Sequence, residues 1–409
     1  MNINWRRTAL GKLETETGGV IQTGPFGSQL HMSDYSDEGT PVVMPTNIRD
    51  MRIDPTDIAR VGDEHVDRLV RHQLRPGDIL YSRRGDVEKC ALVTEHETGW
   101  LCGTGCLLVR VQGEHIDTRF LAYQLSTPAK RGWIRQHAVG LTMLNLNTGI
   151  LREIPIELPD FEEQQRIAGV LGALDDKIES NRAQQHLGEQ LVRALIERII
   201  DQFSGADFTT LDAYCTHLKE SVQPENLVSG DKYIALEHMP RGSVFLNSWV
   251  DAEDAGISSN KTRFRQGDLL FGKLRPYFKK VGVAPVSGVC STDILVIRPR
   301  LREFLPLITV VASSDALINS VSASATGTRM PRASWKDISK WPVPRIADDT
   351  LITLLQPTNQ LIAFSQALSF QSIRLAEVRD ALLPELMSGR MRVDEAGQLV
   401  SEALNTEAC

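Results

Sequence analysis

The chain has 409 residues, of which 42% are hydrophobic, and its formal net charge is −7. This length predicts two or three soluble domains, and the absence of any run of 18 apolar residues argues against a membrane span. The N-terminal residues lack the apolar core of a secretory signal, so we expect a cytoplasmic protein. The six cysteines are dispersed except for Cys102 and Cys106, and no second pair completes a zinc site. We expect no bound metal.

The negative charge is unevenly distributed along the chain. Residues 1–158 carry 18 Lys and Arg against 20 Asp and Glu (−2), and residues 159–205 carry 5 against 9 (−4). Residues 206–345 carry 18 against 14 (+4), and residues 346–409 carry 4 against 9 (−5). The first and third segments are therefore the places where a polyanion could bind, through local clusters of basic residues.

The stretch from Pro159 to Gly205 predicts one long one-faced helix. Apolar residues recur at steps of three and four, and Asp160 followed by Glu163 is typical of a capped helix start. Such a helix would be roughly 65 Å long, which favours a spacer between domains over one long core helix. Asn181, Gln185 and Gly188 stand in its middle where apolar residues would be expected.

The segments on either side of this helix repeat one another. Residues 1–158 read as a mixed α/β domain, with strands within 40–48, 78–82 and 101–111 and a helix over 120–137 that is interrupted near Pro128. Residues 206–345 pass through the same features in the same order. The matched pairs are Gly39–Met44 with Gly230–Ala235, Arg75–Leu80 with Arg265–Leu270, Gly140–Met143 with Gly327–Met330, Ile154–Ile156 with Trp341–Val343, and Ala194–Ile196 with Ala381–Leu383. The numbers of matched positions differ by 191 in the first pair and by 187 in the last three, and this small drift indicates a duplication.

A second helical stretch, from Asp348 to Met387, ends the repeat. Pro357 should kink this helix or begin a new one, and Pro384 with Gly389 should mark its end. The predicted fold class is mixed α/β, with two duplicated globular domains separated by two long antiparallel helices that are related by an approximate two-fold. The expected parts are a first domain (1–158), a central spacer (159–205), a second domain (206–345), a C-terminal spacer (346–393) and a tail (394–409).

No motif of a known catalytic class is present. The sequence lacks a phosphate loop, a Gly-x-Gly-x-x-Gly turn, a Gly-x-Ser-x-Gly elbow, a His-Glu-x-x-His pair and an Asn-Pro-Pro-aromatic motif. We therefore expect no catalytic residue and no cofactor in this chain.

Basic residues interleaved with aromatic ones follow the same predicted strand in both copies. They lie in Tyr81–Lys89 and in Phe271–Lys280, and loops of this composition can bind phosphates or read guanine edges. Two equivalent loops with different residues favour recognition of two targets over merely solvated charge. The candidate DNA-binding residues are Arg83, Arg84, Lys89, Thr142 and Asn145 in the first copy, and Lys273, Arg275, Tyr277, Lys279, Lys280, Arg329 and Arg332 in the second.

These motifs resemble those of the specificity subunit of type I restriction-modification systems. The resemblance rests on Gly77–Gly85, Gly272–Tyr277, Cys290–Asp293 and, most specifically, Ile154–Ala168, and it extends to about Val393. The second copy departs from it, because residues 346–356 lack the Glu-Gln-Gln-Arg-Ile-Ala run.

The resemblance implies two target recognition domains, each reading one half of a bipartite asymmetric DNA site, with the helices setting the gap. It also implies two methyltransferase subunits, which bring S-adenosylmethionine and flip out an adenine, and restriction subunits that use ATP and Mg. We expect the spacer and partner-binding residues to be Gln164, Gln165, Ile167, Leu171, Leu174, Ile178, Leu191, Leu195, Leu361, Leu368, Leu375 and Leu382. The competing hypotheses are a coiled-coil scaffold and a single-chain DNA methyltransferase.

Overall fold

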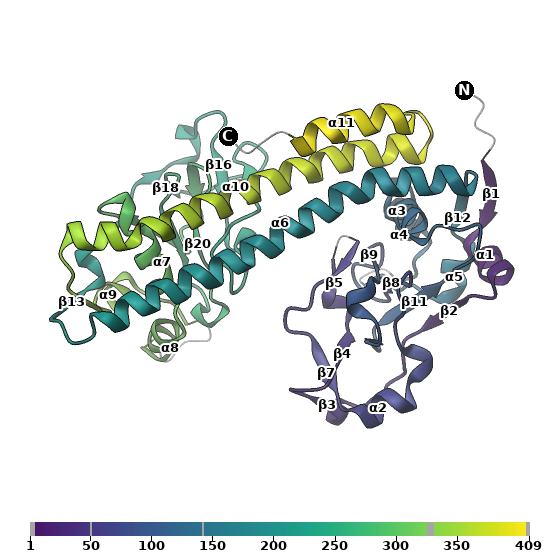
Figure 1. Cartoon of the computed structure of the whole chain (residues 1–409), viewed down its shortest axis with the longest axis horizontal. Helices are drawn as coiled ribbons and strands as arrows, with labels where there is room; N and C mark the ends of the chain where they lie inside the picture. The colour runs from purple at the N-terminus through teal and green to yellow at the C-terminus, as the bar shows by residue number, and fades with distance from the viewer. Residues whose placement is uncertain (1–4, 50, 141–142, 325–330, 406–409) are drawn as a thin grey trace. The chain divides into compact units, whose positions relative to one another are not determined.

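The computed structural model describes residues 5–49, 51–140, 143–324 and 331–405, and its chain divides into two compact units (Figure 1). The first unit holds the chain up to Asp176 together with Ala376–Asn405, and the second holds Lys177–Leu375. Two long helices, α6 (Phe161–Gln202) and α10 (Asp348–Met387), each give one half to each unit.

The globular part of the first unit is a mixed α/β domain. Its main sheet is antiparallel, in the order β2 (Val20–Thr23), β11 (Cys106–Arg110), β8 (Ile79–Ser82) and β9 (Cys90–Leu92). A second sheet has the order β10 (Leu101–Cys102), β4 (Thr40–Val43), β7 (Ala59–Val61) and β3 (Tyr35–Ser36), and two-stranded pairs join β1 (Arg6–Ala9) to β12 (Pro155–Leu158) and β5 (Ile48–Arg49) to β6 (Arg52–Ile53). The helices are α1 (Leu10–Thr17), α2 (Asp63–Arg68), α3 (Thr118–Ser126), α4 (Pro128–His137) and α5 (Thr148–Glu153). The predicted interruption near Pro128 is confirmed, since Pro128 is the first residue of α4.

The second unit repeats this arrangement. Its main sheet has the order β14 (Cys215–Leu218), β22 (Ile294–Pro299), β19 (Leu269–Gly272) and β20 (Val281–Val283). The second sheet has the order β15 (Ser221–Val222), β18 (Lys261–Phe264), β21 (Gly288–Cys290), β16 (Lys232–Ile234) and β17 (Val250–Asp251), and β13 (Phe208–Thr210) pairs with β23 (Pro342–Pro344). The helices are α7 (Leu305–Ser313), α8 (Asp315–Ser324) and α9 (Trp335–Ser339).

The element bounds confirm the duplication. Helices α3 and α4 reappear as α7 and α8, with equal lengths and with the same shift in numbering at all four helix ends. Strand β8 reappears as β19, and the parallel pairing of β10 with β4 recurs between β21 and β16. The two domains therefore share the path of the main sheet and its helices, whereas α1 and α2 have no helical counterpart in the second unit and the second sheet has an additional strand there.

The same buried ion pair anchors the main sheet of both copies. Arg110 on β11 donates to both carboxylate oxygens of Asp78 at 2.7 and 2.6 Å, and Arg298 on β22 donates to Asp268 at the same two distances. Each carboxylate also accepts the backbone N–H three residues earlier, at 2.8 Å. The preceding Gly77 and Gly267 have φ of +86° and +85°, a conformation that glycine adopts without strain. This explains why the Gly-Asp pair is present in both copies.

The central helix has the bounds that the sequence predicted. The carboxylate of Asp160 accepts the N–H of Glu163 at 2.8 Å, which satisfies one of the free donors at the start of α6. Within the first unit α6 packs antiparallel to α10, because Asp175 pairs with Arg379, and within the second unit Asn181 pairs with Gln371. The approximate two-fold stays a prediction.

Of the two outcomes expected at Pro357, a kink or the start of a new helix, the second is wrong. Helix α10 runs without a break in its assignment through Pro357 and Pro384, and it ends near Gly389, whose φ is +66°. Proline deprives the carbonyl of the residue four positions earlier of its partner. That residue, Thr353, is exposed like Pro357 itself, so water can satisfy the carbonyl and no new helix has to begin.

The middle of the helix pair is polar and buried, within the second unit. Asn181 is only 1% exposed and donates to Gln371 Oε1 at 2.8 Å and to Ser372 Oγ at 3.2 Å. Gln185 donates to the carbonyl of Ser365 at 3.0 Å and to the hydroxyl of Ser369. The polar residues that interrupt the apolar seam therefore face the partner helix and not solvent.

Helix α11 (Val393–Asn405) occupies most of the segment that was expected to be a tail. It buries Val393, Ala396, Val400 and Ala403, and Asp394 accepts a hydrogen bond from Arg166 of α6 at 2.5 Å.

In the described part of the chain no single helix is long and apolar enough to cross a membrane. The helical segments Arg302–Ser313 and Asp315–Ser324, which are bent by 57° relative to each other, reach the required length and apolar composition only when they are taken together.

Candidate nucleic-acid interface

The basic segment after β8 is held against a second loop, and we call the two together the first loop pair (residues 83–85 and 144–146). Arg83 donates its N–H to the carbonyl of Gly105 at 2.8 Å and accepts from Leu146 at 2.9 Å. Gly85 donates to Leu144 at 3.2 Å, and Arg84 forms an isolated bridge with Asn145. The structure thus brings together three of the predicted residues, Arg83, Arg84 and Asn145.

The second loop pair (residues 273–275 and 331–333) is built in the same way. Lys273 donates its N–H to Asp293 at 2.8 Å and accepts from Ala333 at 2.9 Å, while Arg275 donates to Pro331 at 3.0 Å. Leu274 forms the bridge with Arg332 that corresponds to the bridge between Arg84 and Asn145. The sequence placed candidate residues in both loops of each copy, and the structure shows that these loops meet at equivalent places.

The predicted residues of the second loop separate into two groups. Arg275 and Arg332 are exposed and Tyr277 is 50% exposed, so their side chains can reach a ligand. Lys279 instead forms an ion pair with Asp315, and Lys280 donates to the carbonyl of Leu236. The chain turns at the 3₁₀ segment Pro276–Phe278, after which Lys279 has φ of +50°, and this turn directs the two lysines away from the loop pair.

The first copy shows a corresponding separation. Lys89 pairs with Asp86 at 2.8 Å, and it is the repeat equivalent of Lys279, whereas Arg84 is exposed. Thr142 and Arg329 lie outside the described residues, so the structure places ten of the twelve candidates.

Two further side chains lie beside the loop pairs and were not predicted. The guanidinium of Arg83 lies 6.0 Å from the ring centroid of Phe26, which is 53% exposed. In the second copy Lys219, at the end of β14, lies close enough to Lys273 to lower its pKa, although burial is the larger cause. Both residues follow the edge strand next to β11 or β22, and only the strand pairing could have revealed that they join the site.

Cationic side chains outnumber anionic ones at the second loop pair. Burial and the nearby Lys219 and Lys273 lower the pKa of His217 to about 4, so this ring is neutral at physiological pH. Burial also lowers the pKa of Lys273, and the carboxylate of Asp293, which pairs with Arg332 at 3.2 Å, opposes that shift only in part. A phosphate or a base edge would therefore meet more donors than acceptors here.

The spacer residues fall into buried and exposed classes. Ile167, Leu171, Leu174 and Ile178 on α6 are buried, as are Leu368, Leu375 and Leu382 on α10, whereas Gln165 and Leu191 are exposed and Leu195 and Leu361 are half-buried. Gln164 is buried and ties α6 to the first domain, because its side chain accepts from Asp117 at 3.0 Å and donates to the carbonyl of Pro159 at 3.0 Å. It is therefore a structural contact of the first unit.

No metal centre is found within the described residues, where no group of three His, Cys, Asp or Glu side chains could hold an ion. Cys90, Cys102, Cys106, Cys215 and Cys290 are buried and form no disulfide in the described part of the chain. Burial raises the pKa of Cys215 and of Cys290 to about 12, so neither thiol is a thiolate at neutral pH.

Comparison with known proteins gives a consistent result. Residues 70–187 match the family described as type I restriction modification DNA specificity domain. The specificity subunit of the type I restriction enzyme MjaIX from Methanocaldococcus jannaschii is 24% identical over 309 residues, which is 68% of this chain and 70% of that protein. The specificity subunit of the Escherichia coli type I restriction enzyme EcoDI is 20% identical over 297 residues, covering 63% of this chain and 65% of that protein.

The fold agrees with these matches. The crystal structure of the S subunit of a type I restriction-modification system from M. genitalium covers 94% of this chain and 96% of its own, with a TM-score of 0.51 at 16% identity. The likeness concerns the fold, because the two domains and the two long helices of this chain fit the layout of that structure. Residues 70–187 therefore carry a type I restriction modification DNA specificity domain, and the chain is similar to the specificity subunits of type I restriction-modification systems.

Proposed function

We propose that this chain binds duplex DNA and that each domain reads one half of a bipartite, asymmetric site. The observation that carries the proposal is the pair of equivalent loop constructions, which have the same backbone bonds but different side chains. The first presents Arg84 and Asn145 and the second presents Arg275 and Arg332. Two loop pairs that share a backbone arrangement but present different side chains are suited to reading two different half-site sequences.

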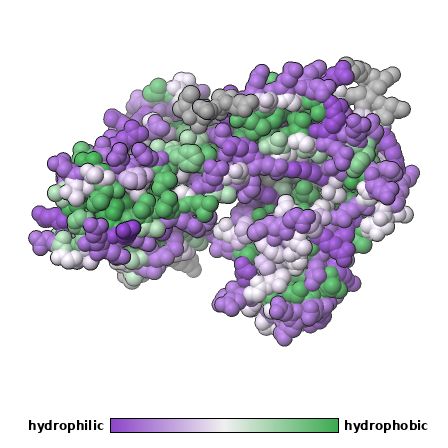
Figure 2. Space-filling model, viewed as in Figure 1, coloured by the Kyte–Doolittle hydropathy of each residue, from purple (hydrophilic) through white to green (hydrophobic). Residues whose placement is uncertain are grey.

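The helices complete the proposed function. Helices α6 and α10 would set the gap between the half-sites and dock two methyltransferase subunits. Leu187 (62% exposed), Leu191 (48%) and Phe364 (51%) offer apolar surface for such docking. Figure 2 shows apolar residues gathered on the visible face over the α6 and α10 halves of the second unit. Exposed apolar patches of this kind are typical of protein interfaces.

The chain itself would perform no chemistry. Methyl transfer, with S-adenosylmethionine, would belong to the methyltransferase subunits, and ATP- and Mg-dependent cleavage to restriction subunits, in the cytoplasm. The absence of catalytic motifs from the sequence supports this division. Methyl transfer by the purified chain alone would contradict it.

The test of the loop pairs uses the partner-bound chain and its methylated sites. Replacing Arg275 or Arg332 by Ala should cost about 1–3 kcal/mol if that side chain reads a base, and should relax one position of one half-site. If it contacts only phosphate, affinity should fall for all sequences and the salt slope should decrease by about one. Lys280→Ala is the matched control, because Lys280 already donates to the protein backbone. Unchanged site methylation by the double variant Arg275→Ala/Arg332→Ala would refute the assignment.

A further inference from the structure

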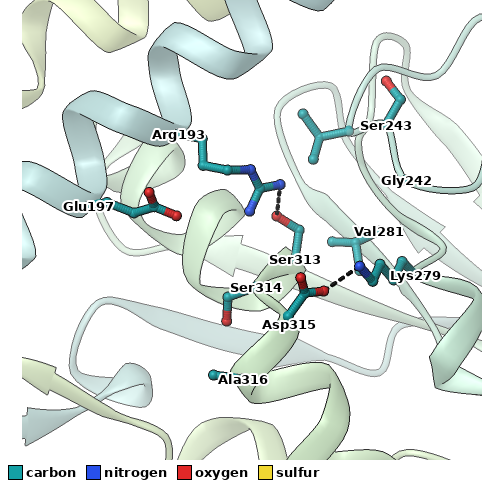
Figure 3. A pocket seen from close by; sticks show the side chains of 11 residues that line it. Arg193, Glu197, Gly242, Ser243, Lys279, Val281, Ser313, Ser314, Asp315 and Ala316 are labelled. Atoms are coloured by element: carbon teal, nitrogen blue, oxygen red, sulfur yellow. Dashed lines mark hydrogen bonds and ion pairs between the residues drawn. The ribbon is translucent and has the colours of Figure 1, made fainter. Parts of the chain in front are cut away.

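A cavity of about 480 Å³ lies in the second unit between α6, the start of α8 and a domain loop. Figure 3 shows Arg193 and Glu197 of α6 on one side and Ser313, Ser314 and Asp315 on the other. The Arg193 guanidinium donates to the hydroxyl of Ser313 at 3.3 Å, and Lys279 completes the wall through its ion pair with Asp315. The cavity therefore contains two cations from two different elements.

A second cavity, of about 490 Å³, lies in the first unit. It is lined by Arg131 and Arg135 of α4, by Arg379 and Asp380 of α10, by Ser126, and by Met51 from a domain loop. Arg379 is paired with Asp175 at 2.7 Å, and Arg135 is paired with Glu88 at 2.9 Å. Cationic side chains again come from the spacer helix and from the recognition domain.

The two cavities are repeat equivalents. In the alignment that superposes α3 on α7, Ser126 corresponds to Ser313, Pro128 to Asp315 and, from α6 to α10, Arg193 to Asp380. The loop residues also correspond, because the N–H of Leu92 on β9 donates to the carbonyl of Met51 at 3.1 Å, and the N–H of Val283, at the equivalent position on β20, donates to the carbonyl of Val244 at 2.9 Å. The same three parts of the repeat thus build both cavities, although most lining side chains differ.

Two equivalent cavities suit a partner that binds twice. What they share is a guanidinium from the spacer helix, a second cation from the domain and the serine at the end of α3 or α7. A carboxylate accepts hydrogen bonds from both guanidinium and hydroxyl groups. Within the described residues Arg193 donates to the Ser313 hydroxyl at 3.3 Å and forms no ion pair with a carboxylate, so its remaining N–H groups can bind one from a partner.

Carboxylates that border the two cavities argue against DNA as the occupant. Glu197 and Asp315 border the second-unit cavity, and Asp380 borders the first-unit cavity. These carboxylates would repel a continuous polyanion, whereas a single acidic side chain can reach the cations between them.

We propose that the two cavities are equivalent docking sites for an acidic side chain carried by the same segment of each methyltransferase subunit. This proposal rests on the proposed function, in which two such subunits bind. It extends the docking surface from the exposed helix faces to a recess between each helix and its recognition domain.

The direct test is photo-crosslinking in the complex of the full chain with the methyltransferase subunits of its own system. A photoreactive amino acid is placed at exposed Ala316 for the second-unit cavity and at Gly132 for the first-unit cavity, where an added Cβ meets no atom within 4 Å. Ser320 and Gln136, which are exposed on the same helices outside the cavities, are the control positions. We expect Ala316 and Gly132 to capture one and the same methyltransferase peptide, containing Asp or Glu, and the controls not to capture it. Capture of DNA, of two unrelated peptides, or of nothing above the controls would overturn the proposal.

Point variants test the charge. Arg193→Ala should weaken binding of one methyltransferase subunit about tenfold in a native mass-spectrometry titration, whereas Arg198→Ala, exposed on the same helix, should change it less than twofold. Arg135→Ala should weaken the other subunit similarly, and Glu88→Ala controls for the loss of their ion pair. Wild-type affinities in both Arg variants would refute the carboxylate contact. If the unaltered chain neither binds methyltransferase subunits nor directs methylation, the proposed function itself fails, so the two failures are distinguishable.

Discussion

The junctions between recognition domain and spacer helices are built differently in the two copies. In the first unit Tyr123 of α3 donates to Asp175 of α6, and Asp175 also accepts from Arg379 of α10 at 2.7 Å. In the alignment of the repeats the corresponding residues of the second unit are Val310, Ile362 and Val192. A polar triad in one copy thus occupies the place of an apolar cluster in the other.

The same chain path is therefore compatible with either a polar triad or an apolar cluster at this junction. Val192, Val310 and Ile362 belong to one large core cluster that includes β19 and β22, so the second junction is continuous with its domain core. The triad of the first unit is partly exposed, with 18% of the Arg379 side chain and 23% of Asp175 accessible. Buried ion pairs and apolar replacements of similar volume often give similar stability, and the two copies are a natural instance of that exchange.

The largest expected effect comes from the Asp–Arg ion pair that both copies share. Asp78→Ala and Asp268→Ala should each lower the free energy of unfolding by about 3–5 kcal/mol, because each leaves an Arg and a backbone N–H without a buried acceptor. Chemical denaturation, with hydrogen exchange to locate the loss, should show each variant destabilising its own unit. A loss of less than about 1 kcal/mol in either would mean that these pairs do not anchor the sheets.

A smaller effect is expected from lengthening the helices. Four residues inserted in α6 between Asn181 and Gln185 add about 6 Å and rotate the rest of the helix by about 40°. Both residues are buried and hydrogen-bonded to α10, so the insertion would separate one of them from its partners. The insertion should therefore cost about 2–4 kcal/mol through two to four lost hydrogen bonds.

A matched insertion of four residues in α10, between Ser369 and Gln371, restores the pairing and is the control. Methylome mapping of this double variant should show both half-site sequences unchanged and a longer gap, by about two base pairs at roughly 3.4 Å each. An unchanged gap with full activity would mean that the helices are not the spacer. Altered half-site sequences would mean that the helices take part in base readout.

The junction itself gives an effect of about 2 kcal/mol. Asp175→Ala removes the acceptor of Tyr123 and Arg379 and should destabilise the first unit by about that amount. Transplanting the second junction, as Tyr123→Val, Asp175→Ile and Arg379→Val together, should recover most of the loss. Calorimetry on the three proteins checks this order. A transplant less stable than the single variant would show that the two junctions are not interchangeable.

The contrast also explains what the sequence could and could not predict. The long helix and the duplication follow from local signals, namely apolar periodicity, capping at Asp160 and the repeated Gly-Asp turns, whereas the meeting of the two loops in each copy is a tertiary contact. The direction of Lys279 and Lys280 depends on a tight turn and on tertiary partners, Asp315 and the carbonyl of Leu236, that are far away in the chain. Helix α11 was missed although its buried residues Val393, Ala396, Val400 and Ala403 follow the three- and four-residue spacing of a one-faced helix, so the sequence did contain the signal.

The smallest expected effect is a pH dependence of stability that comes from a different histidine in each unit. Burial, with Lys219 and Lys273, lowers the pKa of His217 to about 4, whereas strand pairing places Ile21 at the equivalent position. Between pH 6.5 and 4 the unfolded chain binds a proton that the folded ring does not, so stability rises with pH in this window and is lost as pH falls. Because the ring is partly solvated, we expect a contribution of about 1 kcal/mol.

His217→Gln should flatten this part of the profile in the second unit alone. His72, which is buried and whose pKa burial also lowers to about 4, should keep the slope of the first unit, and His72→Gln should reverse the pattern. Hydrogen exchange of peptides from each unit at pH 4, 5 and 6.5, corrected for intrinsic exchange rates, separates the two contributions. A slope that survives His217→Gln in the second unit would assign its acid sensitivity to carboxylates instead, such as Asp212, whose pKa is lowered chiefly by its hydrogen bond with Thr210.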